Sequence, residues 1–106
     1  MEFIETPIFT KQIQELLEDD KYGDLQALLA ENPKTGDAIP GASGLRKIRW
    51  RSPHRGSGKR GGIRVIYYCL SHRQIMMIFA YDKSKQGDLT KKQLKILKNY
   101  TKEKAL

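Results

Sequence analysis

The stretch IRVIYYCLSHRQIMMIFAY, residues 63–81, decides the fold because it contains the two most strand-like segments of the chain. β-Branched and aromatic side chains dominate Ile63–Leu70 and Gln74–Tyr81, which favours extended strands. Ser71-His72-Arg73 between them has the length of a hairpin connection. Their nearly continuous apolar character predicts two central strands of a sheet that is covered on both faces.

A third strand precedes this hairpin. From Leu45 the apolar period becomes two, and Ile48 and Trp50 alternate with cations at positions 47, 49 and 51. One face of this strand is therefore apolar and the other is cationic. Residues 34–44 and the glycine-rich basic segment 52–62, which flank the strand, are expected to be loops.

Helices are expected before and after these strands. Phe3 and Ile4 predict a short first strand, and Thr6-Pro7 is typical of a helix start. Apolar side chains at helical spacing predict one helix after Pro7 and a second from Asp19-Asp20 to Asn32-Pro33. Thr90 and Gln93 have the spacing of a capping box and predict a last helix. Its expected apolar side is Leu89, Leu94, Ile96, Leu97 and Tyr100, and its expected lysine stripe is Lys91, Lys95, Lys98 and Lys102.

This order predicts an α+β fold for a single domain, residues 1–106: a small, mostly antiparallel sheet with an N-terminal helical hairpin and a C-terminal helix. The helices are expected to gather at one side of the sheet. No apolar run approaches the roughly 20 residues of a membrane span, and the N-terminus does not resemble a signal peptide. With a single cysteine, Cys69, a reducing cytoplasm is the expected location.

Charge divides the chain unevenly. The net charge is +8, yet residues 1–32 carry two lysines against eight acids, a net −6, and residues 33–106 carry eighteen cations against four acids, a net +14. No acid stands between positions 46 and 64, where guanidinium groups could bind phosphates with two hydrogen bonds each. A polyanionic partner, most plausibly nucleic acid, is expected. The cations of this segment are Arg46, Lys47, Arg49, Arg51, Arg55, Lys59, Arg60 and Arg64.

Cations and phenols are the side chains available for chemistry. His54, His72 and Cys69 do not have the spacing of metal ligands, so neither a metal nor another cofactor is expected. RNA supplies its own nucleophile, the 2′-hydroxyl, and its cleavage requires proton transfer and stabilisation of phosphorane charge. The candidates on strands next to the basic face are Arg64, Tyr67, Tyr68 and Tyr81. At least one of Tyr67 and Tyr68 is expected to be a half-buried sheet residue, because neighbours on a strand point to opposite faces.

Three segments, GLRKIRW (44–50), GKRGGIRVIYY (58–68) and FAYDKS (79–84), resemble the RelE/HigB toxins of bacterial toxin–antitoxin modules. NPKTGD (32–37) and DLT (88–90) fit the HigB-like branch. The resemblance implies a small α+β protein that cleaves messenger RNA on the ribosome without metal. It also implies silencing by a cognate antitoxin, expected to be a helix-turn-helix protein similar to HigA.

The resemblance also implies roles for individual residues. The family's basic strand maps to positions 47, 49 and 51, and the arginine of its next strand to Arg64; these bind the scissile phosphate and its neighbours, with a lysine as the base. Ser84 and Thr90 stand near the family's late arginine and tyrosine, so Tyr81, Lys83 and Lys85 are the substitutes. The expected catalytic residues are Lys47, Arg64, Tyr81 and Lys83. The expected RNA- and ribosome-binding residues are Arg46, Arg49, Arg51, Arg55, Lys59, Arg60, Lys85, Lys91, Lys95 and Lys98.

Two alternative functions remain open at this stage. The ParE branch of the same fold poisons DNA gyrase and needs no RNA-cleaving residues. A nucleic-acid- or ribosome-binding module without catalysis is the second alternative. The density of cations between Lys47 and Arg64 favours the nuclease over the gyrase poison.

Overall fold

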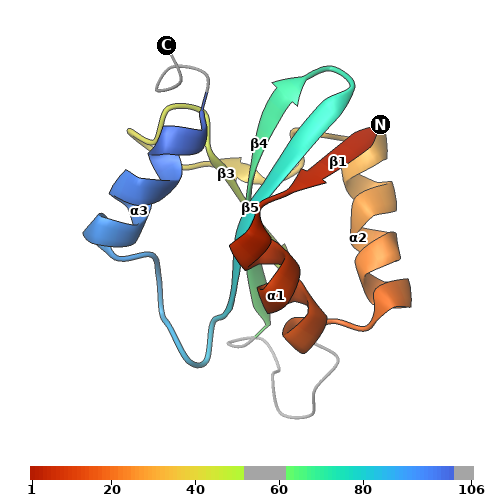
Figure 1. The fold of residues 1–106 in the computed structure, drawn as a ribbon, viewed down its shortest axis with the longest axis horizontal. Helices are drawn as coiled ribbons and strands as arrows, with labels where there is room; N and C mark the ends of the chain where they lie inside the picture. Colours follow the sequence, from red (N-terminus) through yellow and green to blue (C-terminus); the bar gives the residue numbers. More distant parts are fainter. Residues whose placement is uncertain (52–61, 102–106) are drawn as a thin grey trace.

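The computed structural model describes residues 1–51 and 62–101, with the hairpin at its centre (Figure 1). β4 (Ile63–Ser71) and β5 (Gln74–Asp82) pair antiparallel, and only His72 and Arg73 connect them. Ile63–Tyr67 of β4 and most of β5 are buried, whereas the end of β4 is half-buried to exposed. The predicted pair of central strands is therefore confirmed.

β4 and β5 form the middle of a five-stranded sheet with the order β1-β5-β4-β3-β2. β3 (Arg46–Trp50) pairs antiparallel with β4, and the two-residue strand β2 (Asp37–Ala38) pairs antiparallel with β3. β1 (Glu2–Glu5) runs parallel to β5, so the sheet is mixed. The expectation of a mostly antiparallel sheet is corrected here, as is the expectation that residues 34–44 contain no strand.

Thr6 connects the end of β1 to β5 and to the first helix. Its backbone N–H donates to the carbonyl of Met77 at 3.0 Å, and its hydroxyl donates to the carbonyl of Ile78 at 2.8 Å. The same hydroxyl accepts from the N–H of Phe9 at 3.1 Å and caps α1 (Pro7–Leu16). One buried side chain thus fixes the end of β1, the start of α1 and the middle of β5. Because β1 runs parallel to β5, it ends beside Met77, where Thr6 makes these contacts.

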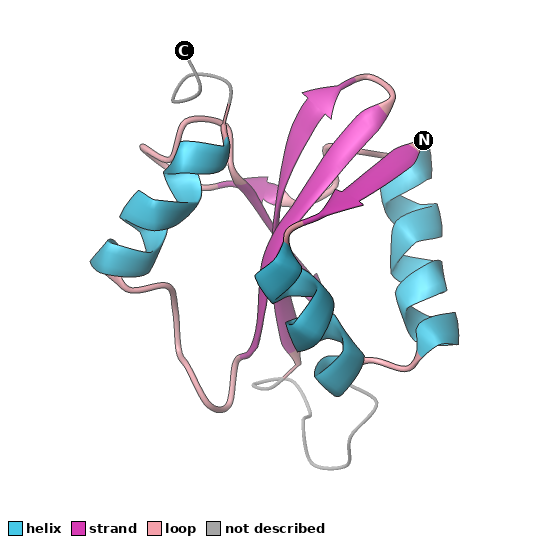
Figure 2. Ribbon diagram, viewed as in Figure 1, coloured by secondary structure: helices cyan, strands magenta, loops and turns pink. Residues whose placement is uncertain are grey.

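The helices cover both faces of the sheet (Figure 2). α1 and α2 (Asp19–Glu31) pack Phe9, Ile13, Leu25 and other apolar side chains on one face. α3 (Lys91–Leu97) packs Leu97 against the opposite face. Helices gathered at one side were expected, and this expectation is wrong. The physical reason is that β4 and β5 are apolar on both faces, and each face requires a cover.

A β-bulge adjusts the register between β4 and β5. Ile66 is opposite Phe79, but Tyr67 is opposite Met77, so Ile78 is an extra residue on β5. Ile78 and Phe79 both join the cluster under α3. Because of the bulge, Met77 and Phe79 lie on opposite faces of the sheet, although residues two apart on a regular strand share a face.

The capping box at the start of α3 is confirmed. The Thr90 hydroxyl accepts from the N–H of Gln93, and the Gln93 side chain accepts from the N–H of Thr90, each at 3.0 Å. The helix is shorter than expected, because a 3₁₀ turn follows at Lys98–Tyr100. Ile96 and Tyr100 are 52% and 39% exposed, so they do not belong to its apolar side. No helix within 1–51 or 62–101 is long and apolar enough to cross a membrane.

Candidate nucleic-acid interface

Three neighbouring strands bring Arg49, Arg64 and Tyr81 into one row. Arg49 on β3 is opposite Arg64 on β4, and Arg64 is opposite Tyr81 on β5. Residues directly opposite one another project from the same face of a sheet. Lys47 lies two residues before Arg49 and therefore shares this face. We call Lys47, Arg49, Arg64 and Tyr81 the cationic row; it lies on the face that α3 covers.

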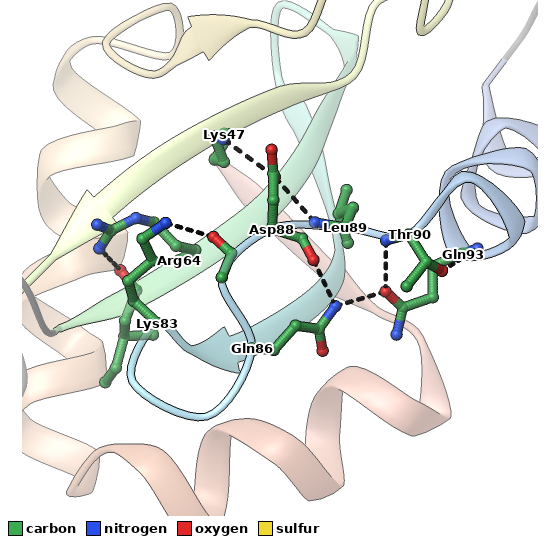
Figure 3. A network of polar contacts seen from close by, with 10 residues as sticks. Lys47, Arg64, Lys83, Gln86, Asp88, Leu89, Thr90 and Gln93 are labelled. Atoms are coloured by element: carbon green, nitrogen blue, oxygen red, sulfur yellow. Dashed lines mark hydrogen bonds and ion pairs between the residues drawn. The ribbon is translucent and has the colours of Figure 1, made fainter.

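Arg64 is the buried member of the row, with 7% of its surface exposed. Its Nη1 approaches the carbonyl oxygen of Ile63 at 3.5 Å, at the limit of hydrogen bonding (Figure 3). The residue opposite Arg64 on β3 is another cation, Arg49. A guanidinium keeps its positive charge when it is buried, so Arg64 places a fixed charge on this face.

The segment that joins β5 to α3 is held by its own side chains (Figure 3). Lys83 Nζ donates to the carbonyl of Gly87. Gln86 Nε2 donates to the carbonyl of Asp88 at 2.9 Å and to Oε1 of Gln93. These contacts connect the segment to the capping box of α3. They fix the position of Asp88 over the sheet.

Asp88 is an anion that contacts this face. Its Oδ1 accepts from the N–H of Leu89 at 2.8 Å and forms an ion pair with Lys47 Nζ at 3.5 Å. The Leu89 N–H, with smaller contributions from Lys47 and Lys83, lowers the pKa of Asp88 below its usual value. The carboxylate is therefore ionised at neutral pH. Its side chain is 72% exposed, so the ion pair is accessible to a competing anion.

The phenol of Tyr81 is buried beside these charges. Tyr81 is 6% exposed, and its hydroxyl has no hydrogen-bond partner among residues 1–51 and 62–101. Burial raises the pKa of Tyr81, and Asp88 raises it further through its negative charge and its close approach to the hydroxyl, while Arg64 opposes the shift. The phenol is thus protonated at neutral pH and can donate a hydrogen bond.

A hollow of about 320 Å³ opens beside the cationic row. Lys47 and Arg49 form part of its lining. The rest comes from β2 and the segment after it, and from α3 and the segment before it. The full lining is Asp37, Ala38, Ile39, Pro40, Lys47, Arg49, Asp88, Leu89 and Leu94.

The other expected binding residues are dispersed. Arg46 belongs to the opposite register of β3 and donates to the carbonyls of Gly36 at 2.5 Å and Lys34 at 3.3 Å, so it braces the segment before β2. Arg51 and Lys85 are exposed near the ends of β3 and β5. Lys91 and Lys95 are exposed on α3, whereas Lys98 begins the 3₁₀ turn, and the continuous helical stripe that was expected ends there. Arg55, Lys59, Arg60 and Lys102 lie outside the described residues.

Sequence reasoning predicted the position of Arg64 on the same face as Lys47 and Arg49, and the strand register confirms it. It missed the ion pair between Lys47 and Asp88, because the two residues are 41 positions apart and no local spacing relates them. In the described part of the chain, no group of three or more His, Cys, Asp and Glu side chains could hold a metal ion. None of the models of known protein families matches the chain.

Proposed function

We propose that the protein is a RelE/HigB-like toxin of a toxin–antitoxin module, an endonuclease that cuts messenger RNA on the ribosome. The observation that carries the proposal is the cationic row, in which Arg49, Arg64 and Tyr81 stand opposite one another with Lys47 alongside. The row joins fixed positive charge to a protonated phenol. In cleavage through the RNA 2′-hydroxyl, the charge would stabilise the phosphorane and the phenol would protonate the 5′-oxygen, while a separate base takes the 2′-hydroxyl proton.

Each residue of the row has a role in this proposal. Arg49 is exposed and receives the phosphate, and buried Arg64 stabilises the charge that develops on the phosphorane. Tyr81 is the proton donor for the 5′-oxygen that leaves. Lys47 and Lys83 are the candidates for the base that takes the 2′-hydroxyl proton. No metal takes part in the proposed reaction.

The positive charge of the protein supports RNA as a proposed partner. Ribosomal and messenger RNA supply the phosphates that balance a net +14 over residues 33–106. The cognate antitoxin is proposed to be a helix-turn-helix protein similar to HigA. The proposed location of the protein is the cytoplasm, where translation takes place.

Arg64→Ala tests the proposal by primer extension on messenger RNA incubated with the protein, with and without 70S ribosomes. We expect the wild-type protein to cut only with ribosomes. Arg64→Ala should lower the single-turnover rate by roughly 100- to 1000-fold, the usual cost of losing one transition-state contact. Arg73→Ala, a change of the exposed arginine in the β4–β5 turn, is the matched control.

Thermal melting of the same preparations separates catalysis from folding. The proposal requires Arg64→Ala to be folded and inactive. A variant that melts earlier but cuts at the wild-type rate per folded molecule would assign Arg64 a purely structural role. Absence of ribosome-dependent cleavage by the wild-type protein would overturn the proposed function.

One observation favours a second function, a nucleic-acid- or ribosome-binding module without catalysis. Both candidate lysines already have partners within the protein: Lys47 forms an ion pair with the Asp88 carboxylate, and Lys83 donates to the Gly87 carbonyl. A lysine must leave its acceptor and lose a proton to solvent before its amine can take a proton from RNA. In this alternative the protein binds ribosomes with an affinity that depends on Arg49, and the messenger RNA stays intact.

A further inference from the structure

We infer that the hollow beside the cationic row binds the nucleobase next to the scissile phosphate, and that it favours guanine. This inference rests on the proposed function, because it identifies the substrate group that the same site selects. The hollow and the row share Lys47 and Arg49. A ligand that fits both must therefore carry an anion joined to a group that fits the hollow.

The apolar part of the lining favours a second group with apolar faces. Ile39 and Pro40 line the hollow from the segment after β2, while Leu89 and Leu94 line it from the α3 end. Such walls accept the faces of an aromatic ring. The volume of about 320 Å³ falls at the lower end of the range of roughly 300–1,000 Å³ seen for small-molecule sites. A base attached to a phosphate meets both requirements.

The rim of the hollow selects among the bases. Asp37 and Asp88 line it, and an ionised carboxylate only accepts hydrogen bonds. Asp88 is ionised and fixed by the Leu89 N–H. Guanine presents two adjacent N–H donors on its Watson–Crick edge, which a carboxylate can accept together. Two carboxylates also disfavour a free anion in the hollow, so inorganic phosphate should bind only at the cations.

Both sides of the hollow are held in place before any ligand binds. On one side, Asp37 is opposite Lys47 in the sheet, and the Ile39 N–H donates to the carbonyl of Leu45 at 2.9 Å. On the other side, the contacts of Gln86 with Asp88 and Gln93 tie the segment before α3 to the helix. A preformed hollow loses little conformational entropy on binding.

The first test needs no ribosome. The four nucleoside 5′-monophosphates and inorganic phosphate are titrated separately into the isotope-labelled protein, and the methyl resonances of Ile39, Leu89 and Leu94 are followed by NMR. We expect saturable shifts with the guanine nucleotide, at about tenfold lower concentration than with the uracil nucleotide. Inorganic phosphate should leave these methyl groups unchanged. Equal shifts from phosphate and nucleotides would overturn the inference.

Filling the hollow provides the second test. Leu94→Trp should abolish the nucleotide-induced shifts at Ile39, and Ile96→Trp on the exposed side of the same helix is the control. If Leu94→Trp does not fold, Ala38→Phe fills the hollow from β2, whose side chain there is exposed. Retention of wild-type nucleotide binding by a folded filled variant would overturn the inference.

Exchange of a rim carboxylate tests base selection on the ribosome. Asp37→Asn should reduce the preference for guanine next to the cut by about tenfold, with Asp24→Asn on α2 as the control. An unchanged preference would refute selection by the rim. Nucleotide binding without any ribosome-dependent cleavage would refute the proposed function and leave the hollow as a nucleotide site. Cleavage without nucleotide binding in the hollow would refute only the inference.

Discussion

At the scale of single residues, two buried phenols differ in their hydrogen bonding. The Tyr67 hydroxyl donates to the carbonyl of Pro33 at 2.8 Å and accepts from the N–H of Gly36 at 2.9 Å. Both contacts fasten the segment before β2 to the sheet. Tyr81 is similarly buried, but its hydroxyl has no partner within the described residues. A buried hydroxyl without a well-formed hydrogen bond costs stability, and the proposed function gives this one a role as a proton donor.

The Tyr81→Phe variant tests this distinction. An unpaired buried polar group costs about 1–3 kcal/mol, so loss of the hydroxyl should leave the free energy of unfolding equal or higher. If Tyr81 donates the proton to the leaving oxygen, the single-turnover cleavage rate should fall by about 100-fold or more. Urea unfolding and ribosome-dependent cleavage measure the two effects.

Tyr67→Phe is the matched comparison, since it removes a hydroxyl that has two partners. We expect it to lower the free energy of unfolding by about 1–3 kcal/mol, and folded Tyr67→Phe to cut at the wild-type rate. If Tyr81→Phe were instead the destabilised variant with full activity, the assignment of the two phenols would be reversed.

At the scale of elements, α3 depends on its cap and its surroundings. It has seven residues, too few for a helix that is stable by itself. Leu97 is buried against the sheet, and the capping box of Thr90 and Gln93 satisfies donors at its first turn. Gln93 also accepts from Gln86, so the same cap orders the segment that carries Asp88. Stability of α3 and geometry of the site are therefore coupled.

We expect Thr90→Ala to lower the free energy of unfolding by about 1 kcal/mol, the usual cost of an N-cap. Because both side chains of the box contribute, Thr90→Ala and Gln93→Ala should be less than additive in a double-mutant cycle. Urea unfolding of the four proteins gives the coupling energy. Strict additivity would mean that the box does not act as a unit.

The sequence predicts the elements better than their arrangement. The strands at 63–71 and 74–82 were predictable because they combine β-branched side chains with a short connection, and α3 because its cap is local. The direction of β1 was not predictable, because a four-residue strand has the same pattern of apolar and polar side chains in a parallel pair as in an antiparallel pair. β2 has only two residues and depends on contacts with β3.

The candidate site is likewise predictable only where local patterns determine it. Alternation along β3 predicts that Lys47 and Arg49 share a face, and the position of Arg64 follows once β3 and β4 pair. The ion pair of Asp88 and the hollow arise where segments distant in sequence meet. Their residues have no mutual spacing that a pattern could reveal. The sequence therefore predicts contacts that follow from strand pairing, but not contacts between loops that are distant in sequence.

At the scale of the whole molecule, charge and architecture coincide. Residues 1–32, with net charge −6, form β1 and the two helices on one face of the sheet. Lys47 and Arg49 lie on the other face, towards α3 with its exposed Lys91 and Lys95. A polyanion is repelled from the first face and attracted to the second. This charge asymmetry turns the face that carries Lys47 and Arg49 towards a polyanion before the two molecules touch.

This asymmetry predicts different roles for lysines on the two faces. Exchange of Lys91 and Lys95 for Gln should weaken ribosome association and reduce the slope of log affinity against log salt by about 1.4–1.8, if each lysine meets one phosphate. The single-turnover cleavage rate at saturating ribosomes should not change, because neither residue belongs to the cationic row. Exchange of Lys11 and Lys21, exposed on α1 and α2, is the control and should alter neither quantity. An unchanged salt slope would show that α3 does not face the ribosome, and a large loss of the saturated rate would move the reaction centre towards α3.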